Sequence, residues 1–357
     1  MLKNTLITRN KIKIGNNAET LLNILLGANQ KENLKDEKSK IIEIMEKKYK
    51  INFITDLSLY NFKKEEKLWK FILKETQFSV GTVPIYLATS ENSFINEEAL
   101  KESIQEQMEE GVSIITIHPT PNRKLLELSK KRLIPFTSRG GGVVLNDLIK
   151  SKKEENVYLR ILEFIIKKAV ENDVIISIGS SFRSASIIDA NDLTYNEELK
   201  EQLKIADYMS SKGVKIILET PGHVDPNNLN KICKKLGQTP HPIMPLGPMV
   251  TDIGELQDDL VGGIGAVLMG TQNCADILSV VTSEEHLGNI PSFTALEEAI
   301  KKYEIIKHII DLAKLNKIDD DYEISFKRKK IKSCRVREKF NCNRCGELCP
   351  LLIDILK

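Results

Sequence analysis

The sequence has 357 residues, enough for one large α/β domain or two ordinary ones, and its 52 lysines and arginines nearly balance its 50 aspartates and glutamates. This balance excludes a global field that would favour nucleic acid or an anionic membrane as a partner. The N-terminus has no apolar run of signal-peptide length, and no later window approaches the roughly 18 uninterrupted apolar residues of a membrane span. We therefore expect a soluble, cytoplasmic protein.

Residues 1–50 are expected to form a small N-terminal helical segment. They contain the apolar stretch "AETLLNILLGA" and the stretch "LKDEKSKIIEIMEKKYK", which is typical of a charged helix. We place the start of the main domain after this segment.

Residues 51–290 alternate short β-rich runs with amphipathic stretches whose apolar residues recur at three- and four-residue spacing. Buried strands that are each followed by a helix predict parallel pairing through right-handed crossovers. Eight such units favour a (β/α)₈ TIM-type barrel over an open doubly wound sheet, and no glycine-rich dinucleotide or phosphate-loop motif opens a helix. The expected strands are 51–57, 79–88, 112–118, 133–138, 173–179, 213–220, 242–248 and 262–270.

Two further segments follow the predicted barrel. Residues 291–324 form a helical C-terminal region, in which "SFTALEEAIKKYEIIKHIIDLAKL" predicts one long helix with a serine cap. Residues 325–357 combine a basic connector, "SFKRKKIKSCRVREKF", with a cysteine-rich tail. The connector is either a solvated linker or a patch for an anionic ligand or nucleic acid.

Polar side chains gather where the predicted strands end, which is where barrels of this type carry their catalytic groups. A single histidine at a strand end is more often structural, and a glycine-rich turn such as "SRGGG" can be no more than a tight connection. The convergence of many such groups on one face nevertheless favours an active site. The candidates are Tyr86, His118, Ser138, Arg139, Arg183, Glu219, His223 and His286.

The chemistry of these groups suits an anionic, polar small molecule. The "SRGGG" turn offers backbone N–H groups at a helix start next to a guanidinium, which is a good phosphate site. His223 and His286, with Glu219 nearby, have the donor types of a nitrogen and oxygen metal site.

The stretch "CNRCGELCP" holds Cys342, Cys345 and Cys349 with C-x2-C-x3-C spacing, and Cys334 lies eight residues upstream of the first. Clustered cysteines in a reducing compartment indicate a metal site more than disulfides. Four thiolates could close a structural zinc site, whereas three on a [4Fe–4S] cluster leave one iron open for S-adenosylmethionine or substrate. Spacing alone leaves both interpretations open.

Taken together, ten motifs in order resemble the phosphomethylpyrimidine synthase (ThiC) family of radical S-adenosylmethionine enzymes. The resemblance covers roughly residues 10–350 and rests on "IGNNA", "GTVPIY", "TIHP", "SRGG", "SIGSSFRSASIIDAND", "ETPGHV", "LGPMVTDIGE", "GGIGAVLMG", "SEEHLG" and the C-terminal cysteines. It implies a barrel whose tail carries a [4Fe–4S] cluster, at which S-adenosylmethionine is cleaved to a 5′-deoxyadenosyl radical. The implied reaction is a lyase step of thiamine biosynthesis that converts 5-aminoimidazole ribotide to hydroxymethylpyrimidine phosphate.

The resemblance also implies partners and site residues. The partners are a phosphorylated ribotide, an electron donor such as ferredoxin or flavodoxin, and a second copy whose barrel is covered by the first chain's tail, with no nucleic acid and no membrane. The implied substrate contacts are Asn16, Tyr86, His118, Ser138, Arg139, Gly140, Arg183 and Glu219, of which Glu219 and Arg183 are the catalytic candidates. The implied zinc ligands are His223 and His286, and the implied cluster ligands are Cys342, Cys345 and Cys349.

Four departures from the family pattern bear on the substrate. The last cysteine gap is one residue shorter than usual, Ser180 stands for an aspartate, Met244 for a tyrosine and Thr55 for a methionine. Because sites built on hydrogen bonds discriminate strongly between substrates, an alternative is a paralogue such as a 5-hydroxybenzimidazole synthase or an enzyme acting on a related ribotide. An alternative of another class is a non-catalytic nucleotide-binding barrel with a structural zinc tail.

Overall fold

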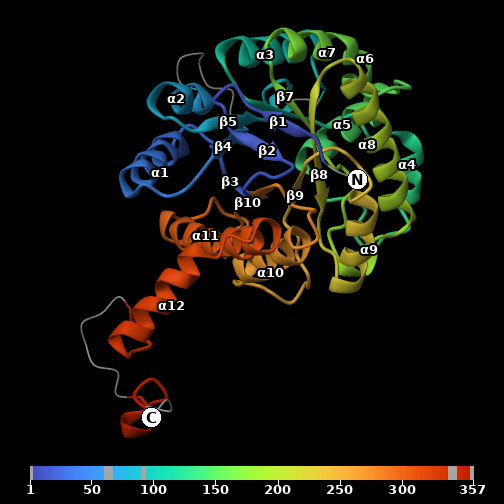
Figure 1. The fold of residues 1–357 in the computed structure, drawn as a ribbon. Coiled ribbons are helices and arrows are strands. Elements are labelled where there is room, and N and C mark those ends of the chain that lie inside the picture. The colour runs from blue at the N-terminus through green and yellow to red at the C-terminus, as the bar shows by residue number, and fades with distance from the viewer. Residues whose placement is uncertain (1–2, 60–66, 90–93, 337–343, 354–357) are drawn as a thin grey trace.

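The computed structural model describes residues 3–59, 67–89, 94–336 and 344–353, and a barrel of eight parallel strands surrounded by helices lies at its centre (Figure 1). This architecture confirms the predicted TIM-type fold class. The strands are β3 (Leu21–Leu26), β4 (Phe53–Asp56), β5 (Ser79–Thr82), β6 (Ile114–Ile117), β7 (Ile175–Ile178), β8 (Lys215–Pro221), β9 (Ile243–Leu246) and β10 (Ile277–Ser279).

The strands follow one another around the barrel in chain order. Each strand from β3 to β8 pairs in parallel with the next, and β10 returns to pair with β3. The last two strands approach at their first residues, where the backbone N–H of Asp276 donates to the carbonyl oxygen of Ile243 at 2.8 Å. The barrel is therefore nearly closed, and all its strands end at the same face.

Helices connect and cover the strands. Side-chain caps set several starts, because Asn96, Ser138 and Asp192 each accept a hydrogen bond from a backbone N–H in the first turn that follows. The helices are α1 (Asn33–Lys47), α2 (Leu68–Glu75), α3 (Glu97–Glu110), α4 (Arg123–Ser129), α5 (Arg139–Ser151), α6 (Val157–Arg160), α7 (Leu162–Glu171), α8 (Leu193–Ser211), α9 (Pro226–Leu236), α10 (Asp258–Gly270), α11 (Phe293–Leu315) and α12 (Asp319–Ile331). Short 3₁₀ turns are η2 (Pro84–Leu87), η3 (Ile187–Asp189), η4 (Glu285–Leu287) and η5 (Gly346–Leu348).

The N-terminal segment is not only helical, and this corrects the sequence interpretation. Leu21–Leu26 is β3, the first barrel strand, and only the charged stretch that follows it is a helix, α1. The apolar run is short and buried on both faces, which suits a strand of a parallel sheet better than a helix. The barrel therefore begins within residues 1–50.

The expected strand at 133–138 is wrong. Leu133 and Ile134 are exposed, and their backbone N–H groups donate to the carboxylate of Asp189 at 2.9 and 3.0 Å instead of pairing in the sheet. The segment is a surface loop that leads from α4 to α5.

The expected strand at 262–270 is also wrong, because these residues belong to α10. Its glycines allow close helix packing: a Cβ atom on Gly265 would collide with the carbonyl oxygen of Pro248, and one on Gly270 would lie 2.5 Å from the side chain of Ile310 on α11. The apolar run thus marks a buried helix. The true last strand is β10, which the sequence analysis missed.

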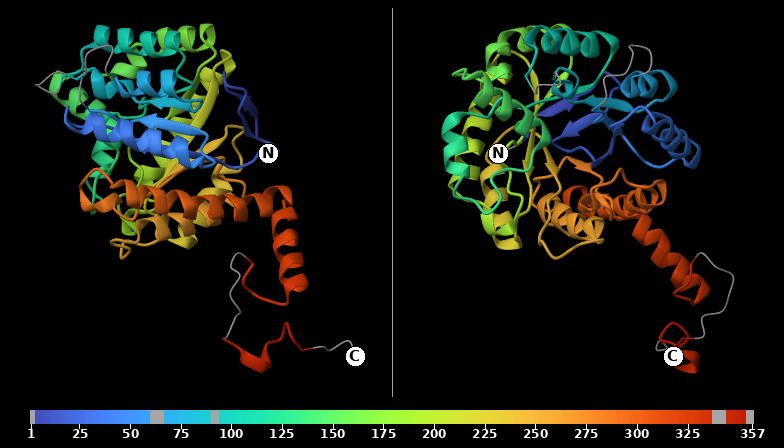
Figure 2. Two further views of the ribbon diagram at one scale, coloured as in Figure 1. Left: turned by 90° about the vertical axis from the view of Figure 1, so that its left-hand side faces the viewer. Right: turned by 180° about the vertical axis from the view of Figure 1, so that it is seen from behind.

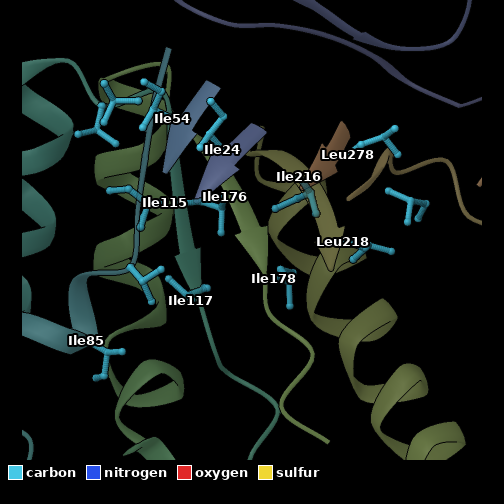
Figure 3. Close-up of a cluster of buried hydrophobic side chains, with 14 of the residues drawn as sticks. Ile24, Ile54, Ile85, Ile115, Ile117, Ile176, Ile178, Ile216, Leu218 and Leu278 are labelled. Atoms are coloured by element: carbon cyan, nitrogen blue, oxygen red, sulfur yellow. The ribbon is translucent and has the colours of Figure 1, made fainter. Parts of the chain in front are cut away.

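Side chains alternate along each strand between two environments. Outward-facing isoleucines such as Ile24, Ile54, Ile115, Ile176 and Ile216 form the main core between strands and helices (Figure 3). A lower inward layer is apolar and comprises Leu21, Phe53, Ile114, Ile175, Ile217 and Ile277. Two residues further along the strands, the inward layer is polar and comprises Asn23, Thr55, Thr116, Ser177, Glu219 and Ser279.

A small hairpin closes the end of the barrel where the strands begin. It pairs β1 (Thr5–Ile7) with β2 (Lys13–Gly15) in antiparallel register. Leu6 and Ile14 pack against the lower apolar layer, and the N–H of Asn4 donates to the carbonyl oxygen of Pro240 just before β9. We call this the closed end of the barrel.

The C-terminal part leaves from the closed end. The last turns of α11 lie beside the residues that precede β3, since the N–H of Thr20 donates to Asp311 at 2.8 Å and Lys317 pairs with Glu19. From there α12, which has no buried residue, turns away from the barrel (Figure 2). In the part of the chain that the structure describes, no helix is long and apolar enough to cross a membrane.

Candidate active site

A cavity of about 330 Å³ opens at the face where the barrel strands end. Its lining comes from strands all around the barrel and from the loops that follow them. The structure brings together eight of the residues singled out from the sequence, namely Tyr86, His118, Ser138, Arg139, Arg183, Glu219, His223 and His286.

His118, after β6, is buried and closely packed in this cavity. A Cβ atom on Gly140 would lie 2.3 Å from its Cε1 and one on Gly179 would lie 2.6 Å from its Cδ2, so both glycines make room for the ring. Burial, together with the charge of Arg183, lowers the pKa of His118 to about 3. The imidazole is neutral, and its Nδ1 has no hydrogen-bond partner among the described residues.

The N-terminus of α5 and two arginines form the positive part of the cavity. Ser138 caps α5, accepting from the N–H of Gly141 at 3.1 Å, and the next residue, Arg139, lies over the ring of Tyr86 at 5.5 Å from its centroid. Arg183 is fixed by a hydrogen bond from its Nη1 to the carbonyl oxygen of Ser180 at 2.9 Å. A helix N-terminus beside two guanidinium groups is suited to a phosphate.

Glu219, at the end of β8, is the buried carboxyl of the cavity. Thr116 donates to its Oε1 at 3.4 Å, and its Oε2 has no partner among the described residues. Burial raises the pKa of Glu219, while the charge of Arg183 acts against this shift. A carboxyl whose pKa is raised keeps its proton to higher pH than a free glutamate and is suited to proton transfer with a ligand.

His223 and His286 lie side by side at the cavity wall, with ring centroids 5.2 Å apart. The Nδ1 of His223 is 2.8 Å from Oδ1 of Asp252, and the Nδ1 of His286 is 2.9 Å from Oδ1 of Asp258. A carboxylate that accepts from Nδ1 leaves Nε2 free as a metal ligand, an arrangement common around zinc. The sequence analysis missed both aspartates, although they lie in the polar segment after β9.

The sequence model of the radical S-adenosylmethionine ThiC family matches residues 1–342, which is nearly the whole chain. The chain belongs to this family. The resemblance inferred from the motifs is thereby confirmed.

Individual relatives agree with the family model. The chain is 30% identical over 315 residues to a phosphomethylpyrimidine synthase of Sulfurisphaera tokodaii, a match that covers 79% of this chain and 72% of that protein. It is 31% identical over 324 residues to the phosphomethylpyrimidine synthase of Carboxydothermus hydrogenoformans, with 81% and 74% covered. Among solved structures, the dihydropteroate synthase of Vibrio fischeri ES114 matches with a TM-score of 0.49 at 11% identity, covering 86% of this chain and 98% of that one.

Two residues implied by the resemblance do not line the cavity. Asn16 follows β2 at the closed end, where its N–H donates to the carbonyl oxygen of Asn4 at 3.4 Å, so it lies at the opposite end of the barrel. Gly140 is in the first turn of α5, and the space that it leaves is occupied by His118. The asparagine that does line the cavity is Asn23 on β3.

The three family departures within the barrel fall in different places. Thr55 and Met244 line the cavity. Ser180 does not, because its hydroxyl points to the buried carboxylate of Glu198, with Oγ 3.4 Å from Oε2. Glu198 also accepts from the N–H groups of Ser181 and Phe182, at 2.6 and 2.7 Å, and so shapes the loop after β7.

Membership of a radical S-adenosylmethionine family implies S-adenosylmethionine and an iron–sulfur cluster as cofactors. Cys345 and Cys349 are free thiols in the C-terminal tail, which suits cluster ligation. Cys342 lies outside the described residues. Within the described ranges, no group of three or more histidine, cysteine and acidic side chains is assembled for a metal ion.

Proposed function

We propose that the chain is a radical S-adenosylmethionine carbon–carbon lyase that converts 5-aminoimidazole ribotide to 4-amino-5-hydroxymethyl-2-methylpyrimidine phosphate, a step in thiamine biosynthesis. One observation carries the proposal. A single cavity joins a helix N-terminus flanked by two guanidinium groups to a neutral buried imidazole and a buried carboxyl. The first part suits a phosphate and the second an uncharged heterocycle.

The phosphate binds at the start of α5. Ser138, Arg139 and the first N–H groups of the helix face it, and Arg183 approaches from the loop after β7. The stacking of Arg139 on Tyr86 limits the positions open to the guanidinium group and so favours one orientation of the ribotide.

His118 and Glu219 act on the ring end of the substrate. His118 stays neutral, so it donates or accepts a hydrogen bond without adding charge beside a radical intermediate. Glu219 has a raised pKa and one oxygen without a hydrogen-bond partner among the described residues, so it exchanges a proton with the substrate. These two residues and Arg183 orient the ribotide for hydrogen-atom abstraction.

The cysteine tail carries the cluster, with Cys342, Cys345 and Cys349 as ligands. When bound, the [4Fe–4S] cluster supplies the electron that cleaves S-adenosylmethionine to the 5′-deoxyadenosyl radical. A ferredoxin or flavodoxin serves as the electron donor. The chain's own tail leaves from the closed end, opposite the cavity. This placement supports a homodimer in which the tail of one chain covers the cavity of the other.

His223 and His286 are the residues that would hold a zinc ion. The fit rests on the two carboxylates that accept from the Nδ1 atoms, which leave the Nε2 atoms available as ligands, and on the 5.2 Å distance between the two ring centroids. A zinc ion bound there would act as a Lewis acid toward oxygen or nitrogen atoms of the substrate or cofactor.

The proposal is tested with anaerobically reconstituted full-length protein, S-adenosylmethionine, dithionite and 5-aminoimidazole ribotide. Mass spectrometry should detect 5′-deoxyadenosine and hydroxymethylpyrimidine phosphate. Cleavage of S-adenosylmethionine without consumption of the ribotide would contradict the named reaction but keep the radical chemistry. A colourless, zinc-only protein would contradict both, and would favour the non-catalytic barrel.

A second candidate is a paralogue that acts on a related ribotide, such as a 5-hydroxybenzimidazole synthase. It is favoured by Thr55 and Met244, because both family departures line the substrate cavity. The same assay decides, since the mass of the product differs between the two reactions.

A further inference from the structure

The cavity floor is a polar cluster from neighbouring strands. Thr55 on β4 donates from Oγ1 to Oδ1 of Asn23 on β3 at 2.9 Å. The Nδ2 of Asn23 lies 3.4 Å from Oγ of Ser279 on β10 and 3.9 Å from Sδ of Met244 on β9. All four side chains are less than a tenth exposed and line the cavity. We call Asn23, Thr55 and Ser279 the floor triad.

The floor triad has hydrogen-bonding capacity to spare. Both contacts of the Asn23 amide nitrogen are long, so its two protons are poorly satisfied. The hydroxyl of Thr55 donates its hydrogen bond to Asn23, so the lone pairs of its oxygen remain available to accept one. The hydroxyl of Ser279 donates no hydrogen bond within the part of the chain that the structure describes. The floor thus offers donors and an acceptor without net charge.

The position of Thr55 is built into the barrel. Thr55 pairs with Gly81 on β5, and a Cβ atom at Gly81 would lie 2.4 Å from Oγ1 of Thr55. Any side chain at residue 81 would displace the hydroxyl from Asn23. The absence of a side chain at Gly81 therefore allows the hydroxyl of Thr55 to lie within hydrogen-bond distance of Asn23.

The floor is the end of the cavity. Below it lie the apolar layer and the hairpin, including Leu21, Phe53 and Leu6, which offer no polar group to a ligand. Arg139 and Arg183 lie above it. A ligand anchored by a phosphate at these arginines presents its uncharged end to the floor triad.

We propose that the floor triad determines substrate specificity. It does so by forming hydrogen bonds with the edge of an uncharged nitrogen heterocycle that carries both a donor and an acceptor. This inference rests on the proposed function, which supplies a phosphorylated ribotide whose ring reaches the floor. Met244 packs its flexible thioether beside the same edge and adapts to the ring outline. A buried site of this kind rejects rings that leave its polar groups unpaired.

The test is isothermal titration of the full-length chain with three phosphorylated probes: ribose 5-phosphate, which has no ring, 5-aminoimidazole ribotide and AMP. Wild type should bind one of the ring-bearing probes more tightly than ribose 5-phosphate. Thr55→Val and Ser279→Ala should each lower the affinity for that probe roughly 5- to 10-fold, as expected for one lost hydrogen bond. The affinity for ribose 5-phosphate should not change.

Thr20→Val is the matched control. Thr20 is a fully buried threonine at the closed end whose hydroxyl also lacks a partner among the described residues, so its replacement should change no affinity. Thermal melting reports whether each variant folds. If Thr55→Val does not fold, the affinities of Ser279→Ala alone test the floor proposal.

The outcomes separate the two proposals. The floor proposal is overturned if wild type binds neither ring-bearing probe more tightly than ribose 5-phosphate. It is also overturned if the variants lower the affinity for all three probes equally. A preference for AMP that the variants abolish, together with no turnover of the aminoimidazole ribotide, would overturn the proposed reaction and support the floor proposal.

Discussion

Asp258 reaches from the first turn of α10 to His286 and accepts twice, from the backbone N–H at 3.2 Å and from the ring Nδ1 at 2.9 Å. This buried carboxylate fixes both the position and the tautomer of the histidine. If His286 is a zinc ligand, Asp258→Asn should reduce zinc affinity about 10- to 100-fold. Competition with a chromophoric chelator measures the change.

The neighbouring residue provides the control. Asp259 is equally buried, but it pairs with Lys302 on α11 and not with a histidine. Asp259→Asn should leave zinc affinity unchanged. Equal losses in both variants would show that the effect comes from α10 as a whole and not from His286.

The glycines of the "SRGGG" turn have different functions, and this can be tested. Gly140→Ala places a methyl group against the ring of His118, so the imidazole or the start of α5 must move, at a cost of about 1–3 kcal/mol. Affinity for the ribotide should fall together with stability. Titration with the ribotide and thermal melting measure the two effects.

Gly142→Ala is the matched variant on the same helix. Its Cβ atom would meet only the edge of Phe136, at 3.1 Å, and a side chain there can shift by a few tenths of an ångström. This variant should remain close to wild type in both measurements. Similar defects in the two variants would contradict the assignment of the Gly140 space to His118.

The sequence predicted the barrel and most of the cavity because both depend on local signals. Alternating strands and helices determine the fold, and polar residues at strand ends reach the cavity wherever the strand was assigned correctly, as for His118 and Glu219. The errors arose where an apolar run fits two kinds of element. Leu21–Leu26 is a strand and 262–270 a helix, and only tertiary packing distinguishes them.

The floor of the cavity could not be predicted for a related reason. Asn23 lay in a segment taken as helical, and Ser279 in a strand that was not recognised. Their proximity depends on the return of the last strand to the first, which brings together residues 256 positions apart. The resemblance also implied that Asn16 contacts the substrate, but Asn16 directly follows the hairpin strand β2 at the closed end.

Glu219 should make stability depend on pH in a defined direction. Its folded-state pKa is raised above the unfolded value of 4.5, so the folded state binds the proton more tightly. The unfavourable contribution is absent below the unfolded pKa and grows as pH rises through the folded pKa. Glu219→Gln should therefore be more stable than wild type at pH 7 to 8 and equal to it near pH 4, while product formation is lost. Chemical unfolding across this pH range measures the difference, and a pH-independent difference would contradict a buried, proton-binding carboxyl.

The cysteine tail separates radical generation from ligand binding. Cys349→Ala removes one proposed cluster ligand from a segment that leaves the barrel at the closed end, so the cavity should keep its fold and its affinity for the ribotide. Iron content, the charge-transfer band at about 400 nm and 5′-deoxyadenosine formation should all be lost. Cys334→Ala is the control, since Cys334 is exposed in the connector after α12 and a cluster with an open iron needs only three thiolates. Loss of the cluster in the Cys334 variant would instead indicate a fourth thiolate ligand, and with it a closed site that cannot bind S-adenosylmethionine.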